Sequence, residues 1–503
     1  MNARGYRPTI GLEIHAELDT RAKMFCACPR VALSAPANHA VCPVCIGLPG
    51  ALPTINAEAM RLAVRAALAL GAEVAETGWF ARKNYFYPDL VKGYQISQSA
   101  TPIGQGGAIE CPDGTRVFLR RIHLEEDTAR LLESRETGRM GVDLNRSGAP
   151  LLEVVTEPAL HSAASAEAAA RALRALLVHL GVSRGRIERG ELRVEANVSV
   201  APAGADKLGA RVEIKNQAGF AHMRAAVEYE IGRQSAVLAG GGIVRQETRG
   251  WNPVRGETFL QRAKEDAHDY RYFPEPDLPA FRLPSAWLAE ERIRVSGPDG
   301  TPRAFAARLA ESGVRAEIRE AILAHDASAF LRSTEAALIR LNAAENKKDD
   351  TPLAAAASGF SRFVLPLLNA MRREMSSLLL TPEALATVLS WSASGRLNPD
   401  GVRLTLAKLA EESGDPEEVA RSVDAFIVDG DNTAVEEAVS AILAERAGWV
   451  TEWRAGKTPL RNAILGEVMK RLGRGHDPRQ VIAVLDRALV DPCRIPPGSE
   501  ETA

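Results

Sequence analysis

The chain has 503 residues, of which 46% are hydrophobic and 25% are charged. At roughly 100–200 residues per domain, this length predicts two to four domains and excludes a small disulfide-stapled scaffold. The composition excludes a disordered chain, and no apolar run approaches the roughly 20 residues that cross a bilayer, so we expect no membrane association. The 62 Lys and Arg balance 64 Asp and Glu, so any nucleic-acid site must be local.

The N-terminal residues enter an alternating strand pattern within about eight positions, without the apolar segment or cleavage site of a signal peptide. We therefore expect a cytoplasmic protein. Six cysteines are too few for a disulfide framework in a chain of this length, so their role must be inferred from their spacing.

The chain falls into two halves of different composition. All seven tyrosines and five of the six cysteines precede residue 273. From residue 7 to about 280, short alternating segments predict a large, mainly antiparallel sheet with helices at 57–72, 163–180 and 222–239. From about 300 onward the spacing is helical, with breaks at Asp349–Pro352, Pro382 and Gly395–Asp400. We expect an α+β fold: a cradle domain over 1–292, then all-helical domains over 293–400 and 401–495.

Two close cysteine pairs, Cys26/Cys28 and Cys42/Cys45, are separated by thirteen residues of loop-rich sequence. Four thiolates from such pairs can converge on one tetrahedral Zn²⁺, which then has no open coordination position and staples a loop rather than reacts. Free structural thiols are the alternative. A redox pair is disfavoured because no thioredoxin-like βαβ pattern surrounds the cysteines.

Three strand patterns place polar side chains together on one face. Residues 10–19 present Glu13, His15, Glu17 and Asp19, residues 192–200 present Arg193, Glu195, Asn197 and Ser199, and residues 211–215 present Arg211, Glu213 and Lys215. One such strand is ordinarily a solvated sheet face. Three strands that together supply His, Glu, Asn and Lys favour a functional site.

Further carboxylates follow in two more segments. Residues 121–127 place His123, Glu125 and Asp127 on one face with Glu126 on the other, and Glu153 ends a short apolar run. Hard oxygen ligands with few imidazoles suit Mg²⁺, which bridges to substrate phosphates. We interpret the face as an Mg-nucleotide site; without a cation, neighbouring Arg and Lys would have to pair every acid.

Acidic and basic residues are segregated in the C-terminal segment. Residues 411–452 hold twelve acids against Arg421 and Arg446, whereas residues 454–487 hold eight bases against three acids. Solvated helix faces explain such runs without any partner. The basic stretch is nevertheless a weak indication of phosphate contacts.

Several common catalytic motifs are absent. Gly456-Lys457-Thr458 ends like a phosphate-binding loop, but Thr451 occupies the position of the required glycine. The sequence also lacks GxGxxG, HExxH and the GxSxG nucleophile elbow, and no Gly-rich serine tract supplies a hydrolytic amidase.

A series of motifs, in order from about 9 to 281, gives the chain a family resemblance. They are GLEIHAEL, the FCAC and CPVCIGLPGALP pair, RKNYFYPDLVKGYQISQ, RIHLEED, VDLNRSGAPLLEVVTEP, EANVSV, VEIKN, QETRGW and HDYRYFPEPDLP. Together they resemble the B subunit of the aspartyl/glutamyl-tRNA amidotransferase. The helical remainder looks like the middle and tail domains of that family, with AGKTPLRNAILGEVMKRL as its clearest anchor.

The resemblance implies one component of an ATP-dependent ligase. Such a protein binds mischarged Glu-tRNA(Gln) or Asp-tRNA(Asn), phosphorylates the side-chain carboxylate with Mg-ATP, and lets ammonia displace phosphate. A carboxylate reacts with ammonia only after its oxygen has become a phosphate leaving group, so the order of steps is chemically required. The family takes ammonia from a glutaminase (amidase) subunit, and a small third subunit clasps the two.

Carried over by motif, the resemblance implies site residues. The catalytic set is Glu13, His15, Glu125, Glu126 and Glu153, of which Glu13, His15, Glu125 and Glu153 would hold Mg²⁺. The ATP- and substrate-binding set is Lys83, Arg193, Glu195, Asn197, Glu213 and Lys215. Cys26, Cys28, Cys42 and Cys45 match the zinc ligands of those members that have them. Lys470, Arg471 and Arg474 would contact the outer part of tRNA(Gln) or tRNA(Asn).

The sequence departs from the family pattern at two positions beside the site. Glu195 replaces an Asp and Glu191 replaces a Ser, which adds one carboxylate and one methylene of reach. Two other hypotheses follow: a paralogue that activates a different carboxylate or aminoacyl-tRNA, and a zinc-stabilised tRNA-binding module without catalysis. The sequence does not decide between Glu-tRNA(Gln) and Asp-tRNA(Asn).

Overall fold

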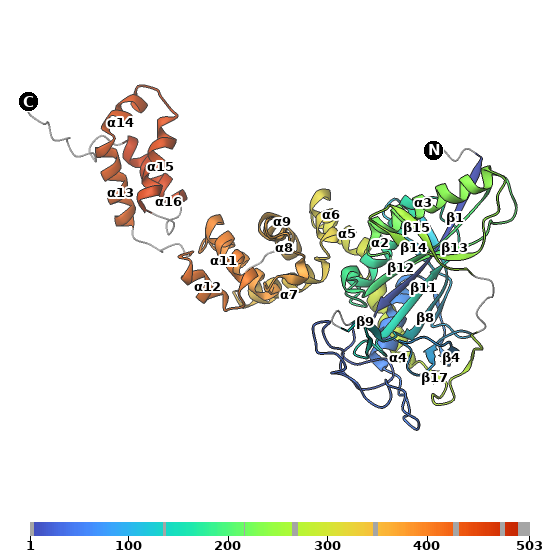
Figure 1. Ribbon diagram of the computed structural model, residues 1–503. Coiled ribbons are helices and arrows are strands. Elements are labelled where there is room, and N and C mark those ends of the chain that lie inside the picture. Colours follow the sequence, from blue (N-terminus) through green and yellow to red (C-terminus); the bar gives the residue numbers. More distant parts are fainter. Residues whose placement is uncertain are drawn as a thin grey trace, which may run out of the picture. The chain divides into compact units, whose positions relative to one another are not determined.

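The computed structural model divides the chain into two compact units, residues 1–308 and 309–503. Figure 1 shows strands and helices in the first unit and helices in the second. The structure describes residues 5–133, 137–215, 217–263, 270–345, 351–425, 432–472 and 478–490.

The core of the first unit is built on β1 (Tyr6–Glu17), whose side chains alternate between apolar and polar. Ile10, Leu12 and Ile14 on the apolar face are at most 1% exposed and pack in the main hydrophobic core. Because successive side chains of a strand point to opposite faces, the polar residues between them must lie on the other face. The predicted inward and outward sets of this strand are confirmed.

The large sheet of the described part has the strand order β15-β14-β13-β12-β1-β11-β8-β6-β2, and β7 also pairs with β8. All of these pairs are antiparallel except β13 with β14, which is parallel. The remaining bounds are β2 (Glu73–Val74), β6 (Gly104–Gln105), β7 (Ala108–Glu110), β8 (Arg116–Glu126), β11 (Pro150–Thr156), β12 (Leu192–Pro202), β13 (Val212–Lys215), β14 (Glu247–Asn252) and β15 (Glu257–Ala263).

Smaller sheets accompany it among the described residues. They are β16 (Phe273–Pro274) with β4 (Ala81–Asn84) and β5 (Tyr94–Ser97), β9 (Arg130–Glu133) with β10 (Met140–Asp143), and β3 (Thr77–Gly78) with β17 (Phe281–Arg282). Strand β5 contacts β8, so the three-stranded sheet lies next to the large one.

The apolar face of the large sheet is covered by α1 (Ala57–Ala69), α2 (Ala163–His179) and α3 (Phe220–Ala239), whose buried residues share its core. These helices match the three predicted ones to within three residues at each end. Side chains cap the N-termini of two of these helices. Asn56 Oδ1 accepts hydrogen bonds from the first-turn amides of α1, and Ser162 forms a capping box with Ser165 at the start of α2. A short helical turn, Ile187–Arg189, and the helices α4 (Ser285–Ser296) and α5 (Pro302–Glu311) complete the helices of this part.

A buried ion pair joins α4 to α1. The Glu291 side chain is fully buried, and its oxygens lie 2.7 Å from Arg65 Nε and 3.2 Å from Arg61 Nη2. Although burial raises it, the hydrogen bonds and charge of Arg65 hold the pKa of Glu291 below its usual 4.5. A depressed folded-state pKa gives stability above about pH 4.5 that is lost as pH falls through the folded value.

We therefore expect Glu291→Gln to lower the free energy of unfolding by about 3 kcal/mol at pH 7, because it removes the counter-charge of Arg65, whose side chain is only 14% exposed. The difference should shrink below pH 4. Denaturant unfolding at both pH values measures it. Glu290→Gln is the matched control, since Glu290 also pairs with Arg61 but is 59% exposed and should contribute under about 1 kcal/mol. Equal stability of the two variants at pH 7 would contradict the expectation.

From Ser285 onward the described residues form helices and no strand. In the second unit these are α6 (Ala316–Ala324), α7 (Ser328–Ala344), α8 (Pro352–Gly359), a π-helical turn (Phe360–Val364), α9 (Leu365–Met371), a 3₁₀ turn (Met375–Ser377), α10 (Pro382–Ala393), α11 (Pro399–Glu411), α12 (Pro416–Ser422), α13 (Asn432–Glu445), α14 (Ala447–Arg454), α15 (Leu460–Leu472) and α16 (Pro478–Val490). Helices α13 to α16 share a core of their own. Pro352, Pro382 and Pro399 each begin a helix, as the predicted breaks required.

One helical stretch in the described part, Pro352–Met371, is long and apolar enough to cross a membrane by length and composition, with a mean hydropathy of 1.2. No run of that length was expected from the sequence. Core helices of globular proteins pass the same test, and Leu353, Phe360 and Val364 of this stretch are at most 3% exposed. Helices α7 and α10 contact it within the second unit.

The prediction of a mixed helix-and-sheet fold with a helical C-terminal part is confirmed. The parallel pairing of β13 with β14 makes the large sheet mixed. The structure places residues 292 and 400 inside α4 and α11. The three-domain division stays a prediction.

Candidate functional site

The candidate site lies on the polar face of the large sheet, where three neighbouring strands place their side chains in register. His15 of β1 is the partner of Glu153 in β11, and Glu153 is the partner of His123 in β8. Glu13 and Glu125 lie two positions away on the same face. The strand order therefore brings together residues that are more than a hundred positions apart.

His15 is the centre of this cluster. Its Nε2 atom lies 3.4 Å from Glu125 Oε1, 3.3 Å from Glu153 Oε2 and 3.9 Å from Glu13 Oε1. A second imidazole joins from the far side, with His123 Nε2 at 3.0 Å from Glu153 Oε2. The structure thus brings together Glu13, His15, Glu125 and Glu153, and it adds His123, which the family resemblance did not assign to the site.

The charges of the cluster are strongly coupled. Burial and the neighbouring Glu153 carboxylate raise the pKa of Glu13 to about 7. Burial lowers the pKa of His15, but hydrogen bonds to Glu125 and Glu153 outweigh it and raise this pKa well above 6.5. Both shifts have one cause, the crowding of carboxylates at one place, which favours the neutral form of Glu13 and the charged form of His15.

Lys83 of β4 supplies a cation near the cluster. Burial lowers its pKa, but the charges of Glu125, Tyr272 and Glu153 raise it well above 10.5. Its Nζ atom lies 5.2 Å from the centre of the Tyr270 ring and 5.8 Å from that of Tyr85. The ammonium therefore lies beside two aromatic rings and is stabilised by the charges of the cluster's carboxylates.

The donor atoms of the cluster fit a divalent cation. Within the described residues, Glu13, His15 and Glu153 form one group with ligand atoms within 4.8 Å of one another, and His123, Glu125 and Glu153 form another. Carboxylate oxygens with one imidazole are a donor set that a hard divalent ion accepts.

Glu126 does not join this cluster. Its Oε1 atom accepts a 2.9 Å hydrogen bond from Ile96 N and pairs with Lys92 Nζ. The next residue, Asp127, accepts from Arg193 at 3.1 Å. Lys92 was not assigned to the site from the sequence, although it lies in the YPDLVKGYQISQ motif, two residues before β5 begins.

The remaining predicted substrate residues lie on β12 and β13. Lys215 Nζ is 2.8 Å from Glu195 Oε2 and 3.3 Å from Glu213 Oε1. Glu195 is the register partner of Glu13, so its ion pair borders the cluster, and Asn197 is the register partner of Glu213. These residues extend the polar face toward the sheet edge.

The departure at Glu191 has a structural explanation. Its carboxylate forms a two-pronged ion pair with Arg186, whose Nε lies 2.8 Å from Oε2. This pair holds the pKa of Glu191 below its usual value despite burial, which raises it. Glu191 therefore forms a separate ion pair, whereas the Glu195 departure lies within the site.

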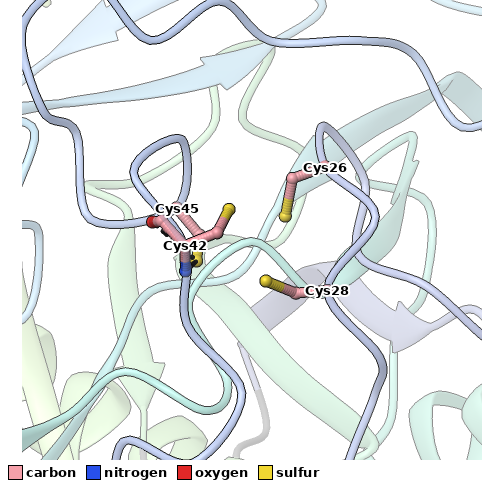
Figure 2. Close-up of side chains that lie close together, drawn as sticks. All are labelled: Cys26, Cys28, Cys42 and Cys45. Carbon is pink, nitrogen blue, oxygen red and sulfur yellow. Dashed lines mark hydrogen bonds between the residues drawn. The ribbon is translucent and has the colours of Figure 1, made fainter.

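The four cysteines form a second candidate metal centre. Cys26, Cys28, Cys42 and Cys45 are free thiols whose sulfurs lie within 4.8 Å of one another. Figure 2 shows the two loops that carry them, with the sulfurs turned toward the space between the loops. A hydrogen bond from the Cys26 thiol lowers the pKa of Cys45 to about 4 and raises that of Cys26. Four converging sulfurs are a tetrahedral donor set.

The basic residues of the last helices are partly paired within the unit. Arg461 forms a two-pronged ion pair with Asp486 at 2.6 and 2.7 Å, and Arg471 Nη1 lies 2.6 Å from Glu445. Lys470 has no ion-pair partner among the described residues. Arg474 lies outside the described residues.

Two protein-family models match this chain. The family model described as the GatB/GatE catalytic domain matches residues 8–289, which contain the carboxylate cluster and the four cysteines. The chain belongs to this family. A second model, described as the GatB domain, matches residues 342–489 in the helical part.

Full-length relatives of the GatB family agree. A protein from Anaeromyxobacter sp. strain Fw109-5, named as the B subunit of the aspartyl/glutamyl-tRNA(Asn/Gln) amidotransferase, is 42% identical over 97% of this chain and 100% of its own length. Proteins of the same name from Nitratidesulfovibrio vulgaris strain DP4 (40% identical over 93% of this chain and 95% of the relative) and Burkholderia vietnamiensis (39% over 95% and 98%) are also similar. The predicted resemblance is confirmed. Membership in this family implies a multi-subunit ligase complex and therefore partner subunits.

Proposed function

We propose that this chain activates the side-chain carboxylate of mischarged Glu-tRNA(Gln), Asp-tRNA(Asn) or both with Mg-ATP, and amidates it with ammonia from a glutaminase subunit. A small clasp subunit completes the assembly, which we place in the cytoplasm. The observation that carries the proposal is the convergence of Glu13, His15, Glu125 and Glu153 near the Lys83 ammonium. The substrate class is supported by the names of the relatives, which include tRNA(Asn/Gln).

The proposed reaction has two steps. A carboxylate oxygen of the aminoacyl side chain attacks the γ-phosphorus of ATP, the bond to the β,γ-bridging oxygen breaks, and ADP leaves with that electron pair. Ammonia then attacks the acyl carbon, loses a proton, and inorganic phosphate leaves. Charge accumulates on the phosphoryl oxygens, so fixed cations at that point lower the barrier.

The chain's own residues have distinct roles in this scheme. Glu13, His15, Glu125 and Glu153 would hold Mg²⁺, which neutralises phosphate charge when bound. Lys83 faces the transferring phosphoryl group from β4. Arg193, Glu195, Asn197, Glu213 and Lys215 line the adjoining face, where the substrate is held. Glu126 is fixed beside the cluster by Lys92 and Ile96.

The test supplies free ammonia to the assembled complex, which bypasses the glutaminase subunit, and follows ATP-dependent conversion of Glu-tRNA(Gln) and Asp-tRNA(Asn). We expect amide formation with one ADP per product. Tight tRNA binding without ATP consumption would instead establish a binding module. ATP consumption with a different acid alone would mark a paralogue, with Glu195 as the first residue to examine.

We expect one equivalent of zinc per chain, held by Cys26, Cys28, Cys42 and Cys45, because four sulfurs converge between the two loops. Elemental analysis of protein purified from metal-replete cells measures it. Cys42→Ser should lower the zinc content, whereas Cys111→Ser, at a buried cysteine outside the cluster, should not. Metal-replete protein without zinc, or with an iron–sulfur absorption band, would contradict this assignment.

The tail should contact tRNA through its basic helices. Replacing Lys470, Arg471 and Arg474 by Ala is expected to weaken tRNA binding and to reduce the slope of log affinity against log salt by up to about 0.7–0.9 per lost phosphate contact. Filter binding at several salt concentrations measures it. Lys408→Ala on α11 is the control. An unchanged slope in the triple variant would return this stretch to a solvated helix face, as the Arg471 to Glu445 pair already suggests for one of its residues.

A further inference from the structure

Lys23 is a buried cation that needs explaining. Its side chain is 1% exposed and is among the largest fully buried side chains of the chain. Its Nζ atom donates to Ala40 O at 2.8 Å and to Leu144 O at 3.0 Å, and it lies 3.6 Å from Cys45 Sγ. No carboxylate of the described residues forms an ion pair with it. A buried ammonium without a counter-charge is costly, so the neighbouring sulfur is its available anionic partner.

The cysteine cluster, when it holds a divalent ion, requires a nearby positive charge. Four thiolates on one divalent ion carry a net charge of about −2, and the need to offset it is greatest at Cys45, the buried member of the four. The Lys23 ammonium and the Cys42 amide, at 3.1 Å, both point at Cys45 Sγ. Donors of this kind around metal ligands raise metal affinity and fix the ligands in place.

The same groups fasten the cluster to the turn at residues 144–148. Lys23 Nζ holds the carbonyl of Leu144, and Ser147 Oγ donates to Cys45 O at 3.2 Å. From the other side, the amide of Met24 donates to Gly148 O at 2.7 Å. Both cysteine loops are therefore tied to this turn, Cys45 directly and the Cys26 loop through Lys23 and Met24.

The turn is hydrogen-bonded to Asp127, the residue that follows β8. Gly148 N donates to Asp127 O at 2.9 Å, and Asp127 N donates to Ala149 O at 2.8 Å. Gly148 has φ +82°, and a methyl group there would lie 3.5 Å from Lys23 Cδ and 3.8 Å from Glu126 Oε2. One residue thus separates the buried lysine from the Glu126 carboxylate.

We propose that the metal-loaded cysteine cluster positions the Glu126–Asp127 end of the candidate site, and that Lys23 couples the two by binding Cys45 Sγ and the 144–148 turn together. This inference rests on the zinc assignment of the proposed function and extends it. The cluster then does more than hold its own loop, although no thiolate reacts. Lys23 is a positioning residue in this arrangement.

The first experiment uses the wild-type complex and hydrogen exchange followed by mass spectrometry. Removing zinc with a chelator should speed exchange in peptides covering 124–127 and 147–150, because the amides of Asp127 and Gly148 lose their fixed partners. Peptides from α2 and from α13 to α16 should not change. Unchanged exchange at 124–127 on zinc removal overturns the positioning role.

The second experiment compares Lys23→Met with Lys408→Met, an exposed lysine on α11. Chelator competition should show zinc bound roughly 10- to 100-fold more weakly in Lys23→Met and unchanged in the control. Lys23→Gln, which keeps an amide donor without the charge, serves if the first variant does not fold. Wild-type zinc affinity in the folded variant overturns the role of Lys23.

The outcomes separate this inference from the proposed function. Protein that takes up no zinc under metal-replete conditions overturns the zinc assignment and this inference together. Protein that binds zinc, shows the exchange change at 124–127 and yet forms no amide leaves the coupling intact and overturns the proposed chemistry.

Discussion

Replacing Glu125 by Ala is expected to cut ATP-dependent amide formation by roughly 10²-fold or more, in line with losses of preorganised electrostatic groups. Glu125 is 2% exposed and contacts His15 at 3.4 Å, so it belongs to both the cation-binding group and the imidazole network. In the proposed reaction, its charge is needed most while the phosphoryl group is being transferred. The affinity for mischarged tRNA should survive, because the proposed tRNA-binding residues lie in the helical tail and not beside Glu125.

The measurement follows single-turnover conversion with free ammonia, alongside tRNA binding. Glu125→Gln separates charge from shape, since it keeps the packing and should be nearly as impaired. Glu110→Ala, which removes a half-exposed carboxylate from β7, is the matched control and should be close to wild type. A Glu125 variant with wild-type turnover would remove this residue from the metal-holding set.

The strand pattern of the site could be predicted from the sequence because its physics is local. Side chains of a strand alternate, so Ile10, Leu12 and Ile14 fix the inward face of β1 and leave Glu13 and His15 on the other. Polar side chains of adjacent strands then lie next to one another wherever the strands pair in the right register. The motifs identified which strands those were, and the structure brought Glu125 and Glu153 to His15.

The features of the site that could not be predicted from the sequence depend on contacts that periodicity does not report. Alternation placed Glu126 opposite Glu125, but it could not show that Lys92 and the Ile96 amide would occupy its carboxylate. The Glu191 departure was interpreted as an added carboxylate beside the site, but the sequence did not show that Arg186, five residues earlier, pairs with it. Periodicity also carries no information on strand direction, so the parallel pairing of β13 with β14 was missed.

Lys83→Met is the second variant from which we expect a large effect, a loss of turnover of roughly 10²- to 10³-fold. The Lys83 ammonium lies beside the Tyr85 and Tyr270 rings, and the charges of Glu125 and Glu153 stabilise it, so it is preorganised before substrate arrives. A cation fixed at that point stabilises charge that develops on the phosphoryl oxygens and costs no rearrangement during the reaction.

The Lys83 prediction separates binding from chemistry. If the ammonium acts on the transferring phosphoryl group, kcat should fall while the KM for ATP changes little, because the interaction strengthens in the transition state. Lys83→Arg should restore part of the rate, since it returns the charge in a different shape. Lys207→Met, at an exposed lysine of the same unit, is the control. A variant that raises KM at unchanged kcat would show that Lys83 holds ATP uniformly, and a variant with wild-type kinetics would leave Lys83 as a structural counter-charge to Glu125 and Glu153.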